Sequence, residues 1–469
     1  MNLGFGWTLH GDGGTPPPGE SVAPHERLSW GRTVGIGAQH VVAMFGATFV
    51  FPVIMGLDPN LAILMSGVAT VLFLLIVQGK VPSYLGTSAS FVGAVATIRL
   101  AGGDSSTVTG AILVAGLALA ATGVLIHVVG GNALNRVLPP VVTGAVVALI
   151  GLNLAPVVSG IYWPQDQWVA FVTMLVVIAG SVLLRGFLAR IAIFVGLVFG
   201  FVLSWVLDRI AGPITSPTGA GEVVAHDRVD LSAVAEAAWI GLPDLHAPSF
   251  EGAAILVALP AVIALIAENA GHVKAVGAMT RTDLDPYLGR AVFADGIGTA
   301  LASSVGGSPT TTYAENIGVM AATRVYSTAA YYVAAAVALL LGFCPKFGAL
   351  IAATPGGVLG GITVVLYGMV ALLGVKIWVE NRVDFSNPLN LVPAAAGVIV
   401  GAGNVPLRIT ENFEITGIAL GTLIVLVGYH LMRAFAPAHL RAAGRAPDAD
   451  SPVDAVDATA GAPRPVARS

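Results

Sequence analysis

The stretches LIAENAGHVKAVGAMTR at residues 265–281 and GGSPTTTYAENIGVMAATR at residues 306–324 decide how this chain folds. Each contains a glutamate, Glu268 or Glu315, after a strongly apolar run. A charged side chain at bilayer depth costs about 2.5 to 3.5 kcal/mol of insertion free energy, so it usually faces a cavity or a partner. The two glutamates therefore predict a pathway for a substrate or an ion.

The composition places the chain in a membrane. Hydrophobic residues make up 56% of its 469 residues and charged residues only 10%, whereas soluble domains carry about 25% charged residues. A net charge of −4 leaves no basic face for nucleic acid. The single cysteine, Cys344, excludes an intrachain disulfide and argues against a thiolate metal cluster. We therefore expect a polytopic membrane protein that has the lipid bilayer as its partner and no metal or cofactor.

Twelve apolar stretches are long enough to cross a bilayer, which takes about 20 residues per helix. They lie at residues 33–55, 61–79, 107–130, 137–155, 168–184, 191–207, 252–273, 287–305, 326–344, 349–375, 388–403 and 415–436. Two shorter stretches, 84–98 and 311–322, begin after Pro82 and Pro309 and are rich in Gly, Ser and Thr. The predicted fold is therefore all-α, with 14 transmembrane segments and broken half-helices in spans 3 and 10.

The placement of Lys and Arg predicts the topology. With a cytoplasmic N-terminus, the inner loops hold ten of these residues and the outer loops five, so both termini are expected in the cytoplasm. The predicted order is a cytoplasmic tail at 1–30, spans 1–7 at 31–207, an external loop at 208–250, spans 8–14 at 251–436 and a disordered cytoplasmic tail at 437–469. We expect the loop to be a surface lid without chemistry of its own.

Two pairs of polar features share nearly one spacing. Pro82 and Pro309 are 227 residues apart, and Gln39, followed by His40, lies 229 residues before Glu268. This spacing predicts an internal repeat, and seven spans per copy would insert the second copy upside down. Inverted repeats with discontinuous helices at matching positions are typical of secondary transporters, whose binding site lies between the repeats.

The polar residues of the broken segments predict the chemistry of that site. Half-helices leave backbone N–H and C=O groups unpaired at membrane depth, where protein or a water-filled cavity has to satisfy them. A carboxyl group accepts hydrogen bonds when ionised and also donates one when protonated, so Glu268 and Glu315 could hold a planar ring edge with alternating N–H and C=O groups. His272 follows Glu268 by four residues on the same helical face and is suited to carry a proton. Asp295 could brace the site or relay a proton.

Structural roles are the alternatives. Glu315 could cap its half-helix, and Glu268 and His272 could have structural roles only; for Asp295 we favour a structural role. We favour a packing role for Gln39 and His40, and leave Tyr313 and Tyr367 open between pocket and core. A channel or an anion exchanger on the same architecture is a rival function, whereas an enzyme is disfavoured because no H-E-x-x-H or G-x-S-x-G motif is evident.

Three motifs in order resemble those of the nucleobase–ascorbate transporter family. They are QH at 39–40 with AMFGATFVFP at 43–52, AENAGHVKAVG at 267–277, and Glu315-Asn316-Ile317-Gly318 followed by Thr323-Arg324. The resemblance covers roughly residues 30 to 435, and a Glu at the start of the last motif looks most like the bacterial uracil permease branch. Two positions depart from that branch: Ala89 stands where it has Phe, and Ala314 where it has Gly.

The resemblance implies a proton-coupled symporter in the bacterial inner membrane that imports a nucleobase, uracil first, with xanthine, uric acid or thymine as alternatives. It implies a substrate-holding core (spans 1–4 and 8–11) and a gate (spans 5–7 and 12–14), with homodimers that pair through the gate. Glu268 and Glu315 would bind the base and His272 would serve proton coupling. The remaining implied site residues are the backbone at Ala89 and Ala314, Ala47 and Tyr313 in the pocket, and Tyr367 on the gate.

Overall fold

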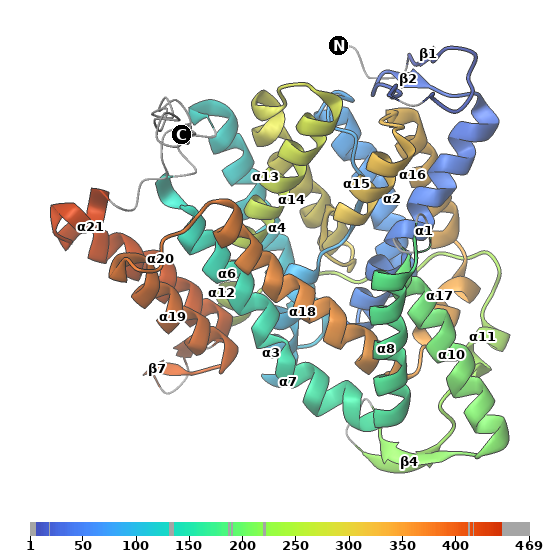
Figure 1. The fold of residues 1–469 in the computed structure, drawn as a ribbon. Helices are drawn as coiled ribbons and strands as arrows, with labels where there is room; N and C mark the ends of the chain where they lie inside the picture. The colour runs from blue at the N-terminus through green and yellow to red at the C-terminus, as the bar shows by residue number, and fades with distance from the viewer. Residues whose placement is uncertain are drawn as a thin grey trace, which may run out of the picture.

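The computed structural model describes residues 6–17, 19–130, 136–185, 188, 191–218, 222–410, 413–415 and 417–442. The described chain is predominantly helical (Figure 1). The helices of its first half are α1 (Trp30–Met55), α2 (Pro59–Ile76), α3 (Val92–Leu100), α4 (Ser105–Val129), α6 (Pro140–Asn153), α7 (Ala155–Val157), α8 (Gln167–Leu183) and α10 (Ala192–Ile210). Those of the second half are α11 (Ser232–Glu236), α12 (Gly252–Ala258), α13 (Pro260–Thr280), α14 (Leu288–Ser304), α15 (Ala314–Thr323), α16 (Thr328–Gly342), α17 (Pro345–Ala352), α18 (Gly356–Glu380), α19 (Pro388–Ala402), α20 (Gly417–Phe435) and α21 (Ala438–Ala442).

The described strands are short and pair two by two. They are β1 (Thr8–Leu9) with β2 (Glu26–Arg27), β3 (Leu85–Thr87) with β6 (Thr310–Thr312), β4 (Ile214–Pro217) with β5 (Val223–His226), and β7 (Leu407–Thr410) with β8 (Phe413–Ile415). The first pair is parallel and the other three are antiparallel. Residues 443–469, most of the predicted C-terminal tail, lie outside the described residues, whereas 438–442 form α21.

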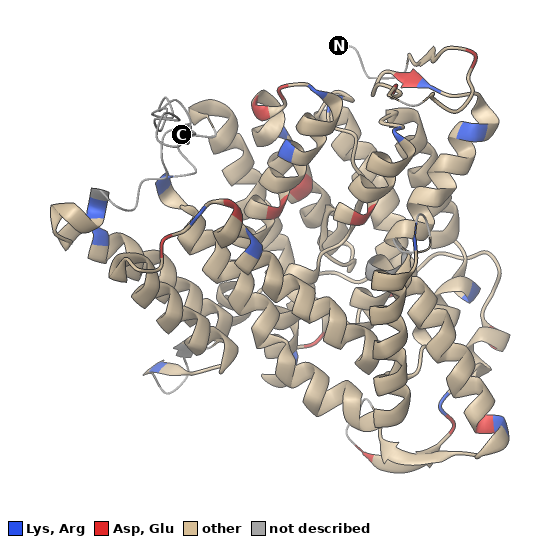
Figure 2. Ribbon diagram, in the orientation of Figure 1, with Lys and Arg blue, Asp and Glu red and all other residues tan. Residues whose placement is uncertain are grey.

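Eight of the described helical segments are long and apolar enough to cross a membrane, and the pair α16–α17, bent by 84°, makes a ninth. Three shorter apolar helices lie at Ala89–Leu100, Gln167–Leu183 and Pro388–Ala402. Charged residues gather toward the two ends of the bundle, while a few acidic residues lie on helices within it (Figure 2). The predicted helical membrane fold is confirmed in this form, and the count of 14 segments remains a prediction.

The two broken segments cross inside the bundle. Buried strands β3 and β6 run antiparallel, with Leu85 opposite Thr312 and Thr87 opposite Thr310. Gly86 permits this crossing, because a Cβ atom there would lie 2.3 Å from Oγ1 of Thr48. The chain then turns at Ala89–Phe91 into α3, and on the other side it enters α15.

Each crossing strand is held by a threonine from a neighbouring helix. Oγ1 of Thr70, on α2, accepts the N–H of Leu85 at 2.9 Å and donates to its carbonyl at 3.4 Å. Oγ1 of Thr299, on α14, accepts the N–H of Thr310 at 3.1 Å and donates to its carbonyl at 2.9 Å. Thr70 and Thr299 are 229 positions apart, which is the spacing between Gln39 and Glu268.

The helices pack in two groups. In the first, here called the α14 group, α14 packs on α4 and α2, and α16 packs on α1 and α2; α3, α12, α13, α15 and α17 belong to it. In the second, the α18 group, α18 packs on α6 and α8, α19 packs on α6 and α20, and α10 packs on α8. Glycines allow close approach in both: a Cβ at Gly296 would lie 2.3 Å from the Ala120 nitrogen, and one at Gly151 equally close to the Ala371 nitrogen.

Residues 6–29 fold onto the end of the α14 group rather than extending as a loose tail, and we call this end the N-terminal face. Val22 is buried, accepts a hydrogen bond from the Tyr326 N–H and donates to the Arg324 carbonyl at 2.8 and 2.9 Å. The Trp7 indole donates to Thr328 at 2.8 Å. Residues 211–218 and 222–250, with β4, β5 and α11, cover the opposite end, here called the loop face (Figure 1).

Glu26 helps to hold the N-terminal segment together. Its carboxylate lies 2.9 Å from Nδ1 of His10 and accepts the Ala23 N–H at 2.8 Å. Burial opposes ionisation of this carboxyl group, but the Ala23 N–H and the His10 side chain outweigh that effect and hold the pKa of Glu26 below its usual value.

Candidate functional site

A cavity of about 370 Å³ lies between the two helix groups. It has the size of a site for a small ligand. Its lining comes from α13, α15 and the turn after β3 on one side, and from α6 and α18 on the other. The lining residues are Ala89, Ser90, Val147, Ile150, Ala264, Ala267, Glu268, Gly271, His272, Ala275, Ala314, Ile317, Val370, Leu373, Lys376, Ile377 and Glu380.

The cavity reaches the C-terminal end of α18. Lys376 and Glu380 line it there, 3.5 Å apart, and their side chains are 63% and 60% exposed. By the predicted topology this mouth faces the cytoplasm. The deeper wall is made mostly of small and apolar side chains.

Glu268 is the carboxylate of the deeper cavity wall, and its side chain is half-buried. It lies close enough to Glu315 and Asp295 to interact with both electrostatically. Glu315 sits in the first turn of α15, directly after Ala314, which is part of the lining. A negative charge in a first helical turn is favourable, because the helix dipole is positive there.

His272 lies one turn beyond Glu268 on α13 and also lines the cavity. Its Nδ1 atom is 2.8 Å from Oγ1 of Thr312, a buried residue of β6. A hydroxyl group can donate to a neutral imidazole nitrogen and accept from a protonated one. Thr312 therefore suits both protonation states of His272.

Of the other five predicted residues, two are brought to the cavity, two are not, and one has a side chain outside the described residues. Ala89 and Ala314, one at the end of each crossing segment, both line it. The Tyr313 hydroxyl instead donates to the Thr87 carbonyl at 2.6 Å and accepts from Thr48 at 3.2 Å, so it holds the crossing. Two further positions remain, Ala47 and Tyr367. The side chain of Ala47, on α1, lies outside the described residues.

Tyr367, on α18, lines a different cavity. This second, apolar cavity of about 390 Å³ is also lined by Gly151, Leu152 and Trp163. The Tyr367 hydroxyl is buried and has no hydrogen-bond partner within the described part of the chain. In this conformation Tyr367 is therefore not part of the lining of the Glu268 cavity.

Two buried asparagines support the site and were missed by sequence reasoning. Each follows a site glutamate: Asn269 donates to Asp295 at 2.6 Å, and Asn316 donates to the His40 carbonyl at 3.0 Å. The His40 ring also packs on a tyrosine of α16, which agrees with the packing role favoured for it. The repeated Glu-Asn pair was the sequence signal that could have identified both asparagines.

Comparisons with known proteins place the chain among permeases. The profile of a permease family matches residues 31–408. A protein of Escherichia coli (strain K12) described as "Putative pyrimidine permease RutG" is 46% identical over 408 residues, which are 86% of this chain and 89% of that protein. The uracil permeases of Paenibacillus larvae and Escherichia coli (strain K12) are each 34% identical, over 86% of this chain and 94% and 92% of theirs.

Solved structures share the fold at low sequence identity. The transmembrane domain of a cyanobacterial bicarbonate transporter, BicA, aligns with a TM-score of 0.52 and 16% identity over 85% of this chain and 96% of that one. The murine anion transporter Slc26a9 in its inward-facing state aligns with a TM-score of 0.62 and 12% identity, over 86% of this chain and 68% of that one. At such identities the likeness concerns the fold alone.

Proposed function

The chain belongs to the nucleobase–ascorbate transporter family, and we propose that it is a proton-coupled symporter that imports a nucleobase, uracil first, across the bacterial inner membrane. The observation that carries this proposal is the cavity in which Glu268 and His272 line one wall beside the ends of the two crossing segments. This small, mostly apolar cavity contains a hydrogen-bonding carboxyl group and an imidazole. Uracil presents a matching edge of alternating N–H and C=O groups.

In this mechanism the carboxyl groups select the base. An ionised Glu268 accepts a ring N–H, and a protonated one donates to a ring carbonyl. The backbone at Ala89 and Ala314 completes the contacts with the edge, and Glu315 strengthens them from the first turn of α15. The apolar residues of α6 and α18 cover the ring faces. Each buried polar contact of this kind discriminates against an analogue that lacks the partner group.

The proximity of Glu268 and His272, one helical turn apart, supports the proposal of proton coupling. A neutral base feels no membrane potential, so its accumulation needs another driving force. One proton that enters down a potential of about 100 mV supplies about 2.3 kcal/mol, which corresponds to more than a tenfold accumulation. We propose that protonation at this pair changes the affinity for the base and thereby links the two movements.

We further propose that the α14 group is the core and the α18 group is the gate of a two-part transporter built from inverted repeats. The matching hydrogen bonds of Thr70 and Thr299 to the two crossing strands support the repeat. The separate packing of the two helix groups supports relative movement. The present conformation, with its mouth at Lys376 and Glu380, is then inward-facing. Pairing of two protomers through the gate belongs to the same proposal.

A base other than uracil is the second candidate for the cargo. Ala89 and Ala314 put small side chains beside the proposed base, and the 46% identical relative carries a pyrimidine permease name. Thymine, with one more methyl group, and the larger xanthine or uric acid are therefore tested beside uracil. Anion exchange is the rival function on this fold, since the structural neighbours carry anion-transporter titles.

The deciding experiment is uptake of labelled uracil into proteoliposomes with an imposed inward proton gradient. We expect accumulation that a protonophore abolishes. Uptake that only equilibrates would contradict the symport mechanism. Gradient-driven uptake of thymine or xanthine, but not of uracil, would show that the cargo is another base. Counterflow with bicarbonate or chloride tests the exchanger.

A further inference from the structure

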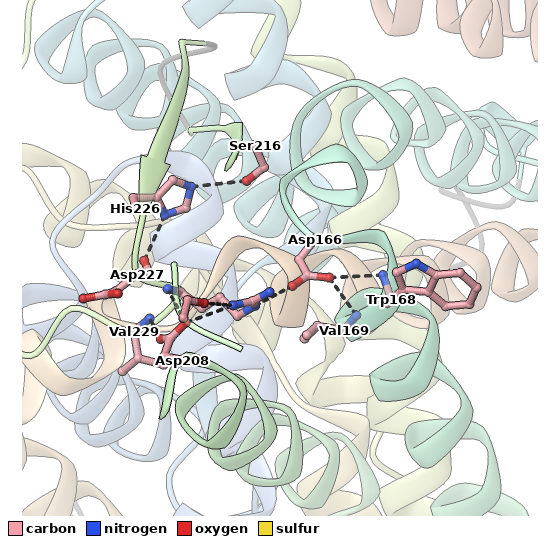
Figure 3. A network of polar contacts seen from close by, with 10 residues as sticks. Asp166, Trp168, Val169, Asp208, Ser216, His226, Asp227 and Val229 are labelled. Carbon is pink, nitrogen blue, oxygen red and sulfur yellow. Dashed lines mark hydrogen bonds and ion pairs between the residues drawn. The ribbon is translucent and has the colours of Figure 1, made fainter. Parts of the chain in front are cut away.

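The loop at 211–250 is fastened to the α18 group by an arginine between two aspartates (Figure 3). Nε of Arg228 donates to Asp166 at 2.8 Å, and its Nη1 donates to Asp208 at 3.1 Å and to the Gly212 carbonyl at 3.0 Å. All three charged side chains are nearly buried, with exposures of 12%, 9% and 11%. Removal of one partner would leave an uncompensated buried charge, which is strongly destabilising.

Both aspartates also bind backbone of the elements they join. Asp166 caps α8 by accepting the N–H groups of Trp168 and Val169, as Figure 3 shows. Asp208, near the end of α10, accepts the N–H of Val229 at 3.0 Å. The anchor therefore ties the loop rigidly to two helices of the α18 group.

The second half of the loop is fastened to the α14 group instead. Nζ of Lys346, on α17, donates to the Val234 carbonyl at 2.6 Å and to the Ala235 carbonyl at 3.3 Å. The Asp244 N–H donates to Asp58, the N-cap of α2, at 3.0 Å. Further backbone bonds follow at residues 246 and 249, which reach the ends of α14 and α4.

Only four residues separate the two attachments. Among the hydrogen bonds of the described residues, Val229 makes the last to the α18 group and Val234 the first to the α14 group, so the bridge is Asp230–Ala233. An extended chain covers about 3.3 to 3.6 Å per residue, and the start of α11 shortens the bridge further because a helix rises only about 1.5 Å per residue. The bridge is therefore short.

From this arrangement we infer that residues 228–246 form a strap that holds the two helix groups together at the loop face and opposes the opening of that face. Opening requires the bridge to unwind α11 or to release the Lys346 attachment, which is the more exposed of the two. The inference rests on the proposed function, because it presumes that the groups move apart there. Its test does not depend on the cargo.

The test lengthens the bridge and measures how often the loop face opens. Four residues, Gly-Ser-Gly-Ser, are inserted between Asp230 and Leu231. The matched control carries the same insertion between Ala247 and Pro248, where both flanking attachments belong to the α14 group. Lys346→Gln is a second variant, which weakens an attachment without lengthening the chain.

The reporter is Ile418→Cys in a Cys344→Ser background, which removes the only native cysteine. Ile418, on α20, is buried, and its Cδ1 would lie 2.6 Å from a Cβ built at Gly93 of α3, so it lies between the two groups. A membrane-impermeant maleimide reaches this thiol only when the groups separate. The labelling rate then follows the population of the open form.

We expect the bridge insertion and Lys346→Gln to raise the labelling rate about fivefold, the shift produced by one net hydrogen bond of about 1 kcal/mol. The control insertion is expected to match the parent. Equal rates for the two insertions, in protein that elutes as a single species, would overturn the strap. Uracil uptake is measured in parallel on the same proteins. If the bridge insertion raises the labelling rate but none of the proteins transports uracil, the strap is supported and only the proposed cargo is refuted.

Discussion

Gly86→Ala is the sharpest test of how the crossing strands position the cavity. The added Cβ would lie 2.3 Å from Thr48 Oγ1 and 2.7 Å from Cζ of Tyr313, whereas carbon atoms in contact normally stay about 3.5 to 4.0 Å apart. Thr48 and Tyr313 are both buried and hydrogen-bonded to each other, so neither can turn aside freely. The strand itself has to move, and it carries Ala89 with it.

Overpacking of a close-packed interior costs about 1 to 3 kcal/mol. If the folded protein adapts by shifting the strand, the same strain appears as weaker substrate binding, and about 1.4 kcal/mol corresponds to a tenfold change in Kd. We therefore expect Gly86→Ala to weaken uracil binding by about tenfold or more and to lower the thermal midpoint. Gly35→Ala, on α1 in open space, is the matched control.

The assay is equilibrium binding of labelled uracil to detergent-purified protein, beside a thermal-shift measurement on the same samples. The control glycine variant is expected to match wild type in both. Wild-type affinity and stability in Gly86→Ala would refute the argument that this crossing is tightly packed and positions the binding backbone.

Three further predictions concern the carboxyl groups and the histidine. Glu268→Gln should abolish uracil uptake without loss of membrane insertion, while Glu380→Gln at the exposed mouth should retain uptake; normal transport by the first variant would remove Glu268 from the site. His272→Ala should bind uracil but fail to accumulate it. Thr312→Val should show a weaker form of the same defect, and Thr312→Ser should restore accumulation. Full gradient-driven accumulation by His272→Ala and Thr312→Val would exclude His272 and Thr312 from coupling. Because the folded-state pKa of Glu26 is lowered, its contribution to attachment of the N-terminal segment is complete above its unfolded pKa near 4.5 and is lost as the pH falls through the lower folded value. The protection factors of the N-terminal segment, from exchange rates corrected for the intrinsic amide rate at each pH, should therefore fall over that acidic range in wild type but not in Glu26→Gln, and pH-independent protection in wild type would contradict this.

The sequence predicted the broken segments and the acid–histidine pair because those features are local. Pro82 and Pro309 mark the breaks, and the four-residue spacing of Glu268 and His272 fixes their common helical face. The structure places both side chains in one cavity with Ala89 and Ala314. Local spacing was sufficient for Glu268 and His272, whereas Ala89 and Ala314 were expected there from the family resemblance.

Other features depended on contacts that no local pattern encodes. Tyr367 lies on a helix that is apolar around its whole circumference, so the sequence could not indicate which side faces the cavity. The polar, Pro/Gly-rich N-terminal segment gave no sign that Val22 pairs with Val325, about three hundred residues away. Arg228 likewise meets its aspartate partner Asp166 only through the fold.

The two ends of the chain are attached to different helix groups. Residues 6–29 are fixed to α15 and α16 of the α14 group, and α21 is held against α19 of the α18 group, where Asn387 donates to the Leu440 carbonyl at 2.8 Å. Fluorescent proteins fused to the two termini would therefore move with different helix groups. Energy transfer between them would report the conformational cycle in living cells, with the transporter itself serving as the sensor.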